Sequence, residues 1–410
     1  MKRGFLNTKR VKDSLASYAP PAVPEPRMLK AKLPIGKVEP TLSNYQASEN
    51  LMEDVDANTT NYADDQVVGT TLPARYFNDE FSDYPDNVTE CLFYGGKVKR
   101  EILATPGFPA SVPRPPHVCH SLETSAFGMG VFATRDIKMG DLIMAERPLS
   151  VTPAAIPPLD LNFPKGFNPT IDQVVEARMI QYEKLLETSI SRMFPENRDA
   201  LFALHNAHTE DGSGPIFGRI RTNGIGVLSG NGDPHFGSTA VFKDISRLNH
   251  SCAPNSTYNF TTASLSMQLR ALRDIKQDEE ITITYCGIED STAERQEALK
   301  PYGFQCTCRI CSDPGSDARL AKIKASTEFT VRNAREGQQH AEKWLAEIET
   351  FGWQGLGQYK KLLAMAMFAA ATAGRTDGVR KYFGMMDAWS RAHGGDKVSD
   401  LHGLSMGLVF

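Results

Sequence analysis

Three short stretches of this sequence constrain its fold more than any other feature does. The first runs from Arg247 to Asn255 and reads Arg-Leu-Asn-His-Ser-Cys-Ala-Pro-Asn. It is too dense in side chains that need specific partners to be an ordinary core strand, so it predicts an ordered functional turn. The second stretch, 280–285, alternates isoleucine with threonine. That is the period of a half-buried strand, which would deliver Tyr285 to one end of a site.

The third stretch brings Cys306, Cys308 and Cys311 within six residues. A closed structural zinc site takes four ligands, so one ligand is missing from this run. Cys252, in the first stretch, is the leading candidate, because a zinc ion shared with the three tail cysteines would close a pocket between the two segments. The alternative is that Cys252 is a buried free thiol and that the cluster takes another ligand.

With these stretches in this order, the chain resembles the SET-domain family of protein lysine methyltransferases. The resemblance is strongest to the SET-and-MYND branch of that family and to its fungal relatives, and it covers about residues 118 to 312. The matching pieces are Gly128–Ala133 with Glu146–Pro148, Arg221–Gly224, Arg247–Asn255, Glu280–Tyr285 and Tyr302–Cys311. No cysteine lies between Leu149 and Ala240, so the MYND zinc finger of that branch is expected to be missing.

The resemblance implies an α+β fold. It consists of a β-rich SET fold with a helical insert, a zinc-binding tail after the core (the post-SET tail) and a helical C-terminal segment. A largely irregular N-terminal extension is expected over 1–115 and the SET domain over 116–312. Within the SET domain, the insert is expected at about 155–240 and the zinc tail at about 300–312. The helical C-terminal segment would then occupy 313–410.

The function that the resemblance implies is transfer of a methyl group from S-adenosylmethionine to a lysine side chain of a protein, histone or non-histone. The expected catalytic residues are Tyr285 and Tyr302. The expected cofactor contacts are Gly128, Met129, Gly130, Asn223, Asn249, His250, Tyr285 and Phe304. The expected ligands of a structural zinc ion are Cys252, Cys306, Cys308 and Cys311.

Two other classes of function stay open at this point. The chain would be a catalytically silent SET-fold binding module if the pocket held a peptide without turning it over. It would be a zinc-stabilised interaction scaffold if the C-terminal helices bound a partner and the pocket had no role.

Composition excludes several other classes of protein. The 45 basic and 49 acidic residues nearly balance, which does not indicate a surface for direct nucleic-acid binding. No apolar run approaches the roughly 18 residues of a membrane span, so no membrane is expected. The basic N-terminus is not followed by an apolar run and therefore does not have the form of a secretory signal. Seven cysteines, three of them clustered, favour a reducing compartment, which means the cytoplasm, the nucleus or both.

Local patterns predict the remaining elements. Eleven acidic residues lie between Glu49 and Glu90 and only Arg75 opposes them, which favours a solvated tail. Two short strands are expected at 128–133 and 142–144. Apolar spacing near 3.6 predicts helices over 171–192, 197–207, 318–335, 338–350, 359–373 and 376–393. The last two would form a hairpin that packs back on the catalytic domain and covers one side of its groove, or that docks a partner.

Overall fold

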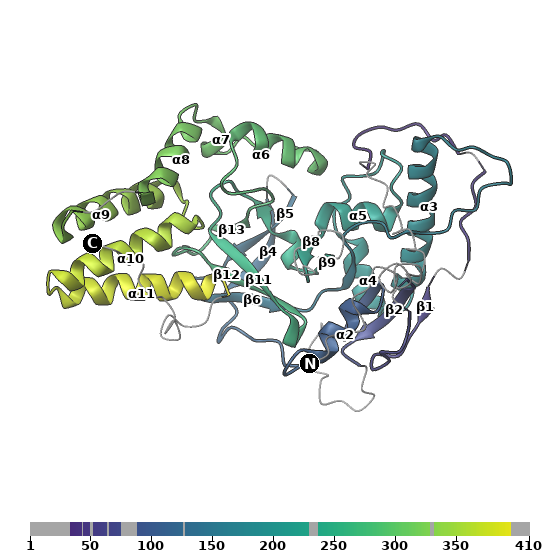
Figure 1. Ribbon diagram of the computed structural model, residues 1–410, viewed down its shortest axis with the longest axis horizontal. Helices are drawn as coiled ribbons and strands as arrows, with labels where there is room; N and C mark the ends of the chain where they lie inside the picture. The colour runs from purple at the N-terminus through teal and green to yellow at the C-terminus, as the bar shows by residue number, and fades with distance from the viewer. Residues whose placement is uncertain are drawn as a thin grey trace, which may run out of the picture. The chain divides into compact units, whose positions relative to one another are not determined.

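A computed structural model describes residues 33–42, 44–49, 52–63, 65–74, 88–125, 128–228, 237–328 and 332–394. The chain divides into two units, Met1–Leu33 and Pro34–Phe410. Every element below lies in the second unit (Figure 1).

A six-stranded sheet carries the N-terminal part of this unit. Its order is β1-β2-β3-β7-β9-β8, and β3 runs parallel to β7. The strands are β1 (Glu53–Asp54), β2 (Val67–Leu72), β3 (Thr89–Tyr94), β7 (Ser150–Pro153), β8 (Ile225–Val227) and β9 (Ser238–Val241).

Within the described part of 1–115, this sheet corrects the expected irregular extension at 53–54, 67–72 and 89–94. Strands β2 and β3 are buried, and helix α2 (Lys97–Ala104) follows them. Since β3 pairs with β7, the sheet crosses the expected boundary at residue 115. The acidic composition was misleading because Glu90 is the one charged residue within β2 and β3, and it forms an ion pair with Arg192 at 2.7 Å.

Two smaller sheets form the centre of the fold. The four-stranded sheet has the order β10-β13-β5-β4, and the three-stranded sheet has the order β11-β12-β6. The strands are β4 (His120–Ser125), β5 (Gly128–Ala133), β6 (Leu142–Glu146), β10 (Asn249–His250), β11 (Ser256–Thr261), β12 (Ser266–Ala271) and β13 (Glu280–Ile283). Both strands predicted around residues 128–144 are confirmed, but they belong to different sheets. Their apolar faces meet in one core that includes Val131, Ile143, Phe242 and Ile281.

The helical insert contains α3 (Ile171–Ile190), α4 (Pro195–Phe202) and α5 (Pro215–Asn223). Helix α3 confirms the prediction for 171–192 and begins at a capping box formed by Thr170 and Gln173. Helix α4 is shorter than the expected 197–207, and no pattern had predicted α5. The C-terminal end of α5 matters for function, because it reaches the cavity described below.

Six helices and four short 3₁₀ turns complete the described elements. The helices are α6 (Thr292–Leu299), α7 (Arg309–Ser312), α8 (Ser316–Ala325), α9 (Ala334–Phe351), α10 (Gly357–Thr372) and α11 (Thr376–Ala392). The 3₁₀ turns are η1 (Ile245–Arg247), η2 (Thr262–Ser264), η3 (Lys300–Tyr302) and η4 (Ser326–Glu328). The predicted helix over 318–335 is wrong beyond Ala325. There the chain turns into η4, whose Ser326 hydroxyl donates to the Ile323 carbonyl.

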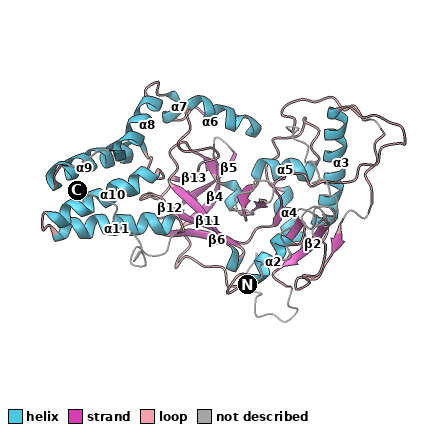
Figure 2. Ribbon diagram, in the orientation of Figure 1, coloured by secondary structure: helices cyan, strands magenta, loops and turns pink. Residues whose placement is uncertain are grey.

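Helices α10 and α11 form the predicted hairpin and pack back on the centre of the fold. Helix α11 lies beside β11 and β12 (Figure 2). A Cβ atom placed on Gly140 would approach the Ala388 backbone of α11 to 2.9 Å, so the two backbones are in close contact. The Trp389 ring nitrogen donates to the Gln354 carbonyl at 2.7 Å.

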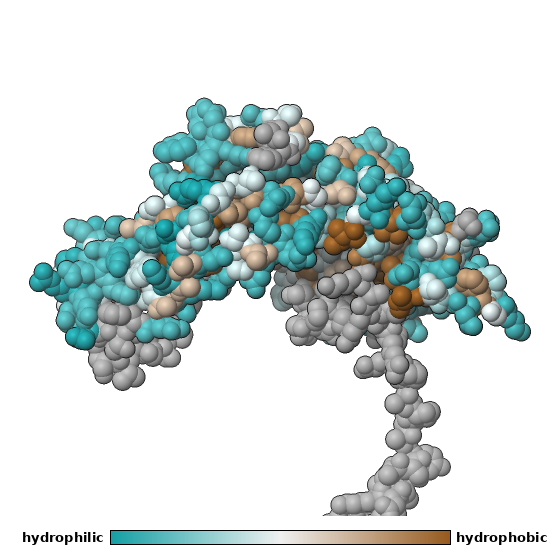
Figure 3. Space-filling model, turned by 90° about the horizontal axis from the view of Figure 1, so that it is seen from above, coloured by the Kyte–Doolittle hydropathy of each residue, from teal (hydrophilic) through white to brown (hydrophobic). Residues whose placement is uncertain are grey.

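The surface shows no large apolar area on the face drawn in Figure 3, where hydrophobic residues form small patches in a mainly hydrophilic surround. Among the described helices, none combines the length and the apolar character that a bilayer crossing needs.

Candidate functional site

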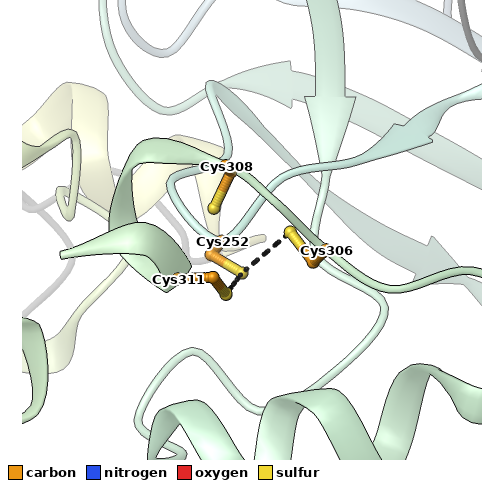
Figure 4. Close-up of side chains that lie close together, drawn as sticks. All are labelled: Cys252, Cys306, Cys308 and Cys311. Carbon is orange, nitrogen blue, oxygen red and sulfur yellow. Dashed lines mark hydrogen bonds between the residues drawn. The ribbon is translucent and has the colours of Figure 1, made fainter. Parts of the chain in front are cut away.

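Four cysteine sulfur atoms meet beside α7, all within 4.8 Å of one another (Figure 4). Cys252 comes from the turn after β10, Cys306 and Cys308 come from the segment that leads into α7, and Cys311 lies within α7. The Sγ atom of Cys252 lies 3.4 Å from that of Cys311 and 3.8 Å from that of Cys306. All four are free thiols, so the structure brings the four predicted ligands together without a disulfide.

This arrangement fits a tetrahedral zinc ion. With Zn–S bonds of about 2.3 Å, tetrahedral geometry places neighbouring sulfur atoms about 3.8 Å apart. A hydrogen bond with Cys252 lowers the pKa of the Cys308 thiol, whereas hydrogen bonds with Cys286 and Cys308 raise the pKa of Cys252. Gln296 of α6 holds the cysteine segment 306–311 in place, because its side chain donates to the Cys306 carbonyl and accepts from the Cys306 N–H.

The cysteine cluster also joins two parts of the unit. Cys252 belongs to a buried core that contains Ile310, Leu320, Ile348 and Trp353, so the cluster packs against the C-terminal helices. A metal here would therefore fix the turn after β10 to both the tail and the helical segment.

A cavity of about 200 Å³ is lined in part by Leu248, which directly precedes β10. Its walls come from the end of α5, strand β8, turn η1, strand β11, and the ends of β13 and η3. They consist of Thr222, Asn223, Gly224, Ile225, Gly226, Ile245, Ser246, Leu248, Tyr258, Ile283, Thr284, Tyr285 and Tyr302. The cavity is smaller than the roughly 300–1,000 Å³ of sites for whole small molecules, so it suits one side chain. None of the described C-terminal helices contributes a residue to these walls, and cover of a groove by the hairpin stays a prediction.

Tyr285 has the position that the alternating stretch predicted. Ile281 and Ile283 of β13 are buried, and Tyr285 follows the strand end into the cavity wall. Its hydroxyl donates to the Leu248 carbonyl at 2.5 Å, and its ring lies 4.8 Å from that of Tyr302. Burial raises the pKa values of Tyr258, Tyr285 and Tyr302, so all three phenols stay protonated near neutral pH.

The predicted glycine loop meets the Asn249 side chain. Asn249 donates to Glu280 Oε1 at 2.7 Å, and its amide nitrogen lies 3.5 Å from the Met129 carbonyl. A Cβ atom on Gly130 would lie 2.6 Å from Glu280 Oε1 and 3.1 Å from the Asn249 amide nitrogen. Gly128 has φ +99°, which favours glycine, and its side faces open space. The loop therefore leaves Gly128 and Met129 exposed beside a fixed amide, whereas Gly130 is buried.

The other predicted cofactor residues have distinct surroundings. The Asn223 amide nitrogen donates to the carbonyls of His205 and Arg219, at 2.7 and 2.8 Å, so its donors are used within the insert. Phe304 is 41% exposed, with its ring 6.1 Å from that of His250. His250 lies between the cysteine cluster and Tyr285, and burial lowers its pKa to about 4. Contact of these residues with a cofactor stays a prediction.

Sequence reasoning missed three residues of the site. Tyr258 lines the cavity from β11, Glu280 fixes Asn249, and the almost fully buried Asn255 connects the turn to β13. The Asn255 side chain accepts from the Thr282 N–H and donates to the Glu280 carbonyl, each at 2.8 Å. Glu280 and Asn255 lie inside the stretches already singled out, whereas nothing local marks Tyr258.

Comparison with known proteins identifies one domain. Residues 128–286 match the family described as SET domain. The histone-lysine N-methyltransferase set5 of Schizosaccharomyces pombe is 30% identical over 186 residues, which are 45% of this chain and 47% of that protein. The N-lysine methyltransferase SMYD2 of Gallus gallus is 29% identical over 171 residues, or 37% of this chain and 38% of that protein. The chain thus spans less than half the length of these two relatives.

A solved structure of the SET domain of LSMT bound to lysine and AdoHcy is also similar. It covers 66% of this chain and 77% of its own, with 10% identity. The TM-score of 0.25 is too low to relate the two sites.

Proposed function

We propose that this chain, whose residues 128–286 form a SET domain, is a methyltransferase that uses S-adenosylmethionine and acts on a lysine side chain of a protein. The observation that carries the proposal is the tyrosine-walled cavity, whose wall residue Leu248 directly precedes Asn249, the residue beside the glycine loop. The volume of the cavity suits one long side chain, and its walls hold three uncharged phenols.

The residues beside the cavity fit the methyl donor. S-adenosylmethionine, when bound, would supply an electrophilic methyl group, whose carbon an amine attacks while the demethylated thioether leaves. The exposed backbone of Gly128 allows close approach of a ligand, the buried Gly130 lets the strand lie close to Glu280 and Asn249, and the Asn249 amide, held by Glu280, offers a fixed polar group. The ring of the exposed Phe304 offers an apolar surface nearby.

The cavity lowers the free-energy cost of deprotonating the substrate lysine, which must lose its positive charge before it can react. An amine with a pKa near 10.4 costs roughly 4.6 kcal/mol to hold neutral at pH 7. A partly buried cavity disfavours the ammonium form and so reduces this cost. Tyr285 and Tyr302 then orient the amine, and such positioning supplies much of the rate in an in-line displacement. No nucleophilic side chain is required.

We expect the rate to follow the protonation of the substrate lysine. Tyr285 has a raised pKa and His250 a pKa of about 4, so neither changes charge between pH 6 and 9. The neutral fraction of the lysine rises about tenfold per pH unit in this range, and kcat/KM for a peptide should rise with it. Initial rates across this range check the slope. If the plot of kcat/KM against pH instead bent at a pKa near 6.5, a histidine would be acting as a general base.

Replacing Gly130 with alanine should weaken binding of S-adenosylmethionine by about tenfold or more, because the new methyl group would displace Glu280 or Asn249. Calorimetric titration measures the change. Gly384→Ala in α11 is the matched control, since a Cβ there meets nothing within 4 Å. Equal affinities in the two variants would remove the glycine loop from the cofactor site.

The test of the function itself has two parts. Calorimetry measures binding of S-adenosylmethionine and of its demethylated product to the full chain. A peptide array with mass-spectrometric readout then detects methyl transfer, and copies of each peptide with arginine in place of lysine serve as controls. A chain that binds neither the donor nor its product contradicts the proposal. A chain that binds the donor and the peptides without transfer is instead the silent binding module.

The substrate and the compartment belong to this proposal as well. The relatives include one enzyme described as acting on histone lysine and one described more generally as acting on lysine, so either class of protein is a suitable substrate. The free cysteines of the described residues fit a reducing compartment, the cytoplasm or the nucleus.

A further inference from the structure

Both ring nitrogens of His250 are engaged, and they connect the cysteine cluster to the cavity. Nε2 lies 3.2 Å from the Sγ atom of Cys252, one of the four cluster sulfurs. Nδ1 lies 3.1 Å from the backbone nitrogen of Tyr285, which lines the cavity. One imidazole therefore contacts a metal ligand on one side and the main-chain amide of a catalytic candidate on the other.

The partners fix the tautomer of this ring. A backbone N–H can only donate, so Nδ1 must accept and carries no proton. The proton is then on Nε2, where it points at the Cys252 sulfur. With no free lone pair and no free N–H, the ring is not available as a general base or as a side-chain contact to the methyl donor.

Tyr285 is held at two points by one short segment. Its backbone N–H donates to His250, and its hydroxyl donates to the carbonyl of Leu248 two residues earlier. The strand pairing supports this clamp, because β10 runs parallel to β13 with His250 opposite Ile283. Any displacement of the His250 ring would therefore move one of the two anchors of Tyr285.

We propose that His250 is a positioning residue that couples the four-cysteine cluster to Tyr285. Its Nε2–H donates to the Cys252 sulfur and its Nδ1 accepts from the Tyr285 amide, so the position of this sulfur and the shape of the cavity are set together. The catalytic part of this proposal rests on the methyltransferase function proposed above. The link between His250 and Cys252 does not depend on it.

The first experiment tests the hydrogen bond between His250 and Cys252 and needs no assay of activity. The full chain is loaded with Co²⁺ in place of Zn²⁺, and its sulfur-to-cobalt charge-transfer bands are recorded. A hydrogen bond to a thiolate lowers the energy of the sulfur lone pairs, so its loss shifts these bands to longer wavelength. His250→Ala should show this shift while four-sulfur tetrahedral coordination is kept. His117→Ala, at an exposed histidine, should leave the bands in place.

Two further variants test the roles of the two ring nitrogens, Nε2 and Nδ1, separately. The amide of glutamine reaches about as far as Nε2 and that of asparagine about as far as Nδ1. His250→Gln should therefore restore the cobalt bands toward the wild type, whereas His250→Asn should not. Histidine ¹⁵N NMR of the zinc-loaded wild type should show the Nε2–H tautomer, and this reading is independent of how the variants fold.

The kinetic arm tests the effect on catalysis. His250→Ala should lower kcat by about tenfold or more and change the KM for peptide by less than about threefold, as expected when a catalytic group loses its alignment. Hydrogen exchange of the Tyr285 amide should also become faster. Unchanged cobalt bands together with an Nδ1–H tautomer would overturn the proposal. A wild type that shows the predicted bands and tautomer but transfers no methyl group would contradict only the proposed function.

Discussion

Replacing Cys252 with serine is expected to remove the bound zinc and to abolish methyl transfer. Zinc held by thiolates contributes about 10–16 kcal/mol in zinc-finger peptides, so loss of one of four ligands removes a large part of the binding free energy. In this chain the ion would join the turn after β10 to the tail and to the core of the C-terminal helices. We expect the zinc content to fall from one to near zero per chain, with a lower melting temperature and a rate reduced by about a hundredfold or more.

Elemental analysis, thermal unfolding and methyl-transfer rates measure these three quantities. Cys286→Ser is the matched control, because Cys286 is a free thiol in the same region and does not belong to the four-sulfur group. The control should keep one zinc ion per chain. If Cys286→Ser lost zinc and Cys252→Ser retained it, the assignment of the fourth ligand would be wrong. Chelation of the wild type should reproduce the effect of Cys252→Ser.

Tyr285→Phe should reduce kcat by about a hundredfold while leaving the fold and the zinc content unchanged. The substitution removes one hydroxyl, whose hydrogen bond to the Leu248 carbonyl fixes the wall of the cavity. Removal of a single preorganised polar group from an active site typically costs about 10²–10³ in rate. The free energy of unfolding should fall only slightly, because one hydrogen bond contributes only about 0.5–1.5 kcal/mol to it.

Single-turnover rates and calorimetric binding of S-adenosylmethionine separate chemistry from binding. Tyr382→Phe in α11 is the control, because its hydroxyl also donates a hydrogen bond, to Glu342 at 2.8 Å, far along the chain from the cavity residues. Equal rates for Tyr285→Phe and the wild type would mean that the hydroxyl has no part in the reaction. A variant that loses zinc or unfolds would show that Tyr285 is structural.

Local sequence was sufficient for much of the secondary structure and for three of the four thiols of the metal site. The spacing of Cys306, Cys308 and Cys311 places three thiols on one short segment, whatever the rest of the chain does. The alternation of Ile281 and Ile283 with threonines predicts the strand that leads to Tyr285, and the structure confirms that strand. Helices α3, α10 and α11 followed from their apolar periodicity.

Local sequence failed where a residue's neighbours come from distant segments. β2 and β3 were missed because an acidic composition described the whole segment, although their own residues are almost uncharged and buried. Tyr258 was missed because a tyrosine in β11 looks the same whether it faces solvent, core or cavity. The helix predicted to continue past Ala325 was wrong because a hydroxyl bonded to the backbone ended it there.

By itself, the sequence determined which groups are available: four thiols, a row of tyrosines, a glycine loop and the strand that carries Tyr285. Only the tertiary structure decided that Cys252 meets thiols 54 and 59 positions away, and that His250 uses both ring nitrogens to connect them to the cavity. The physical reason is that periodicity and spacing act within one element. Contacts between elements are set by the burial of whole faces, which depends on every segment that packs against them.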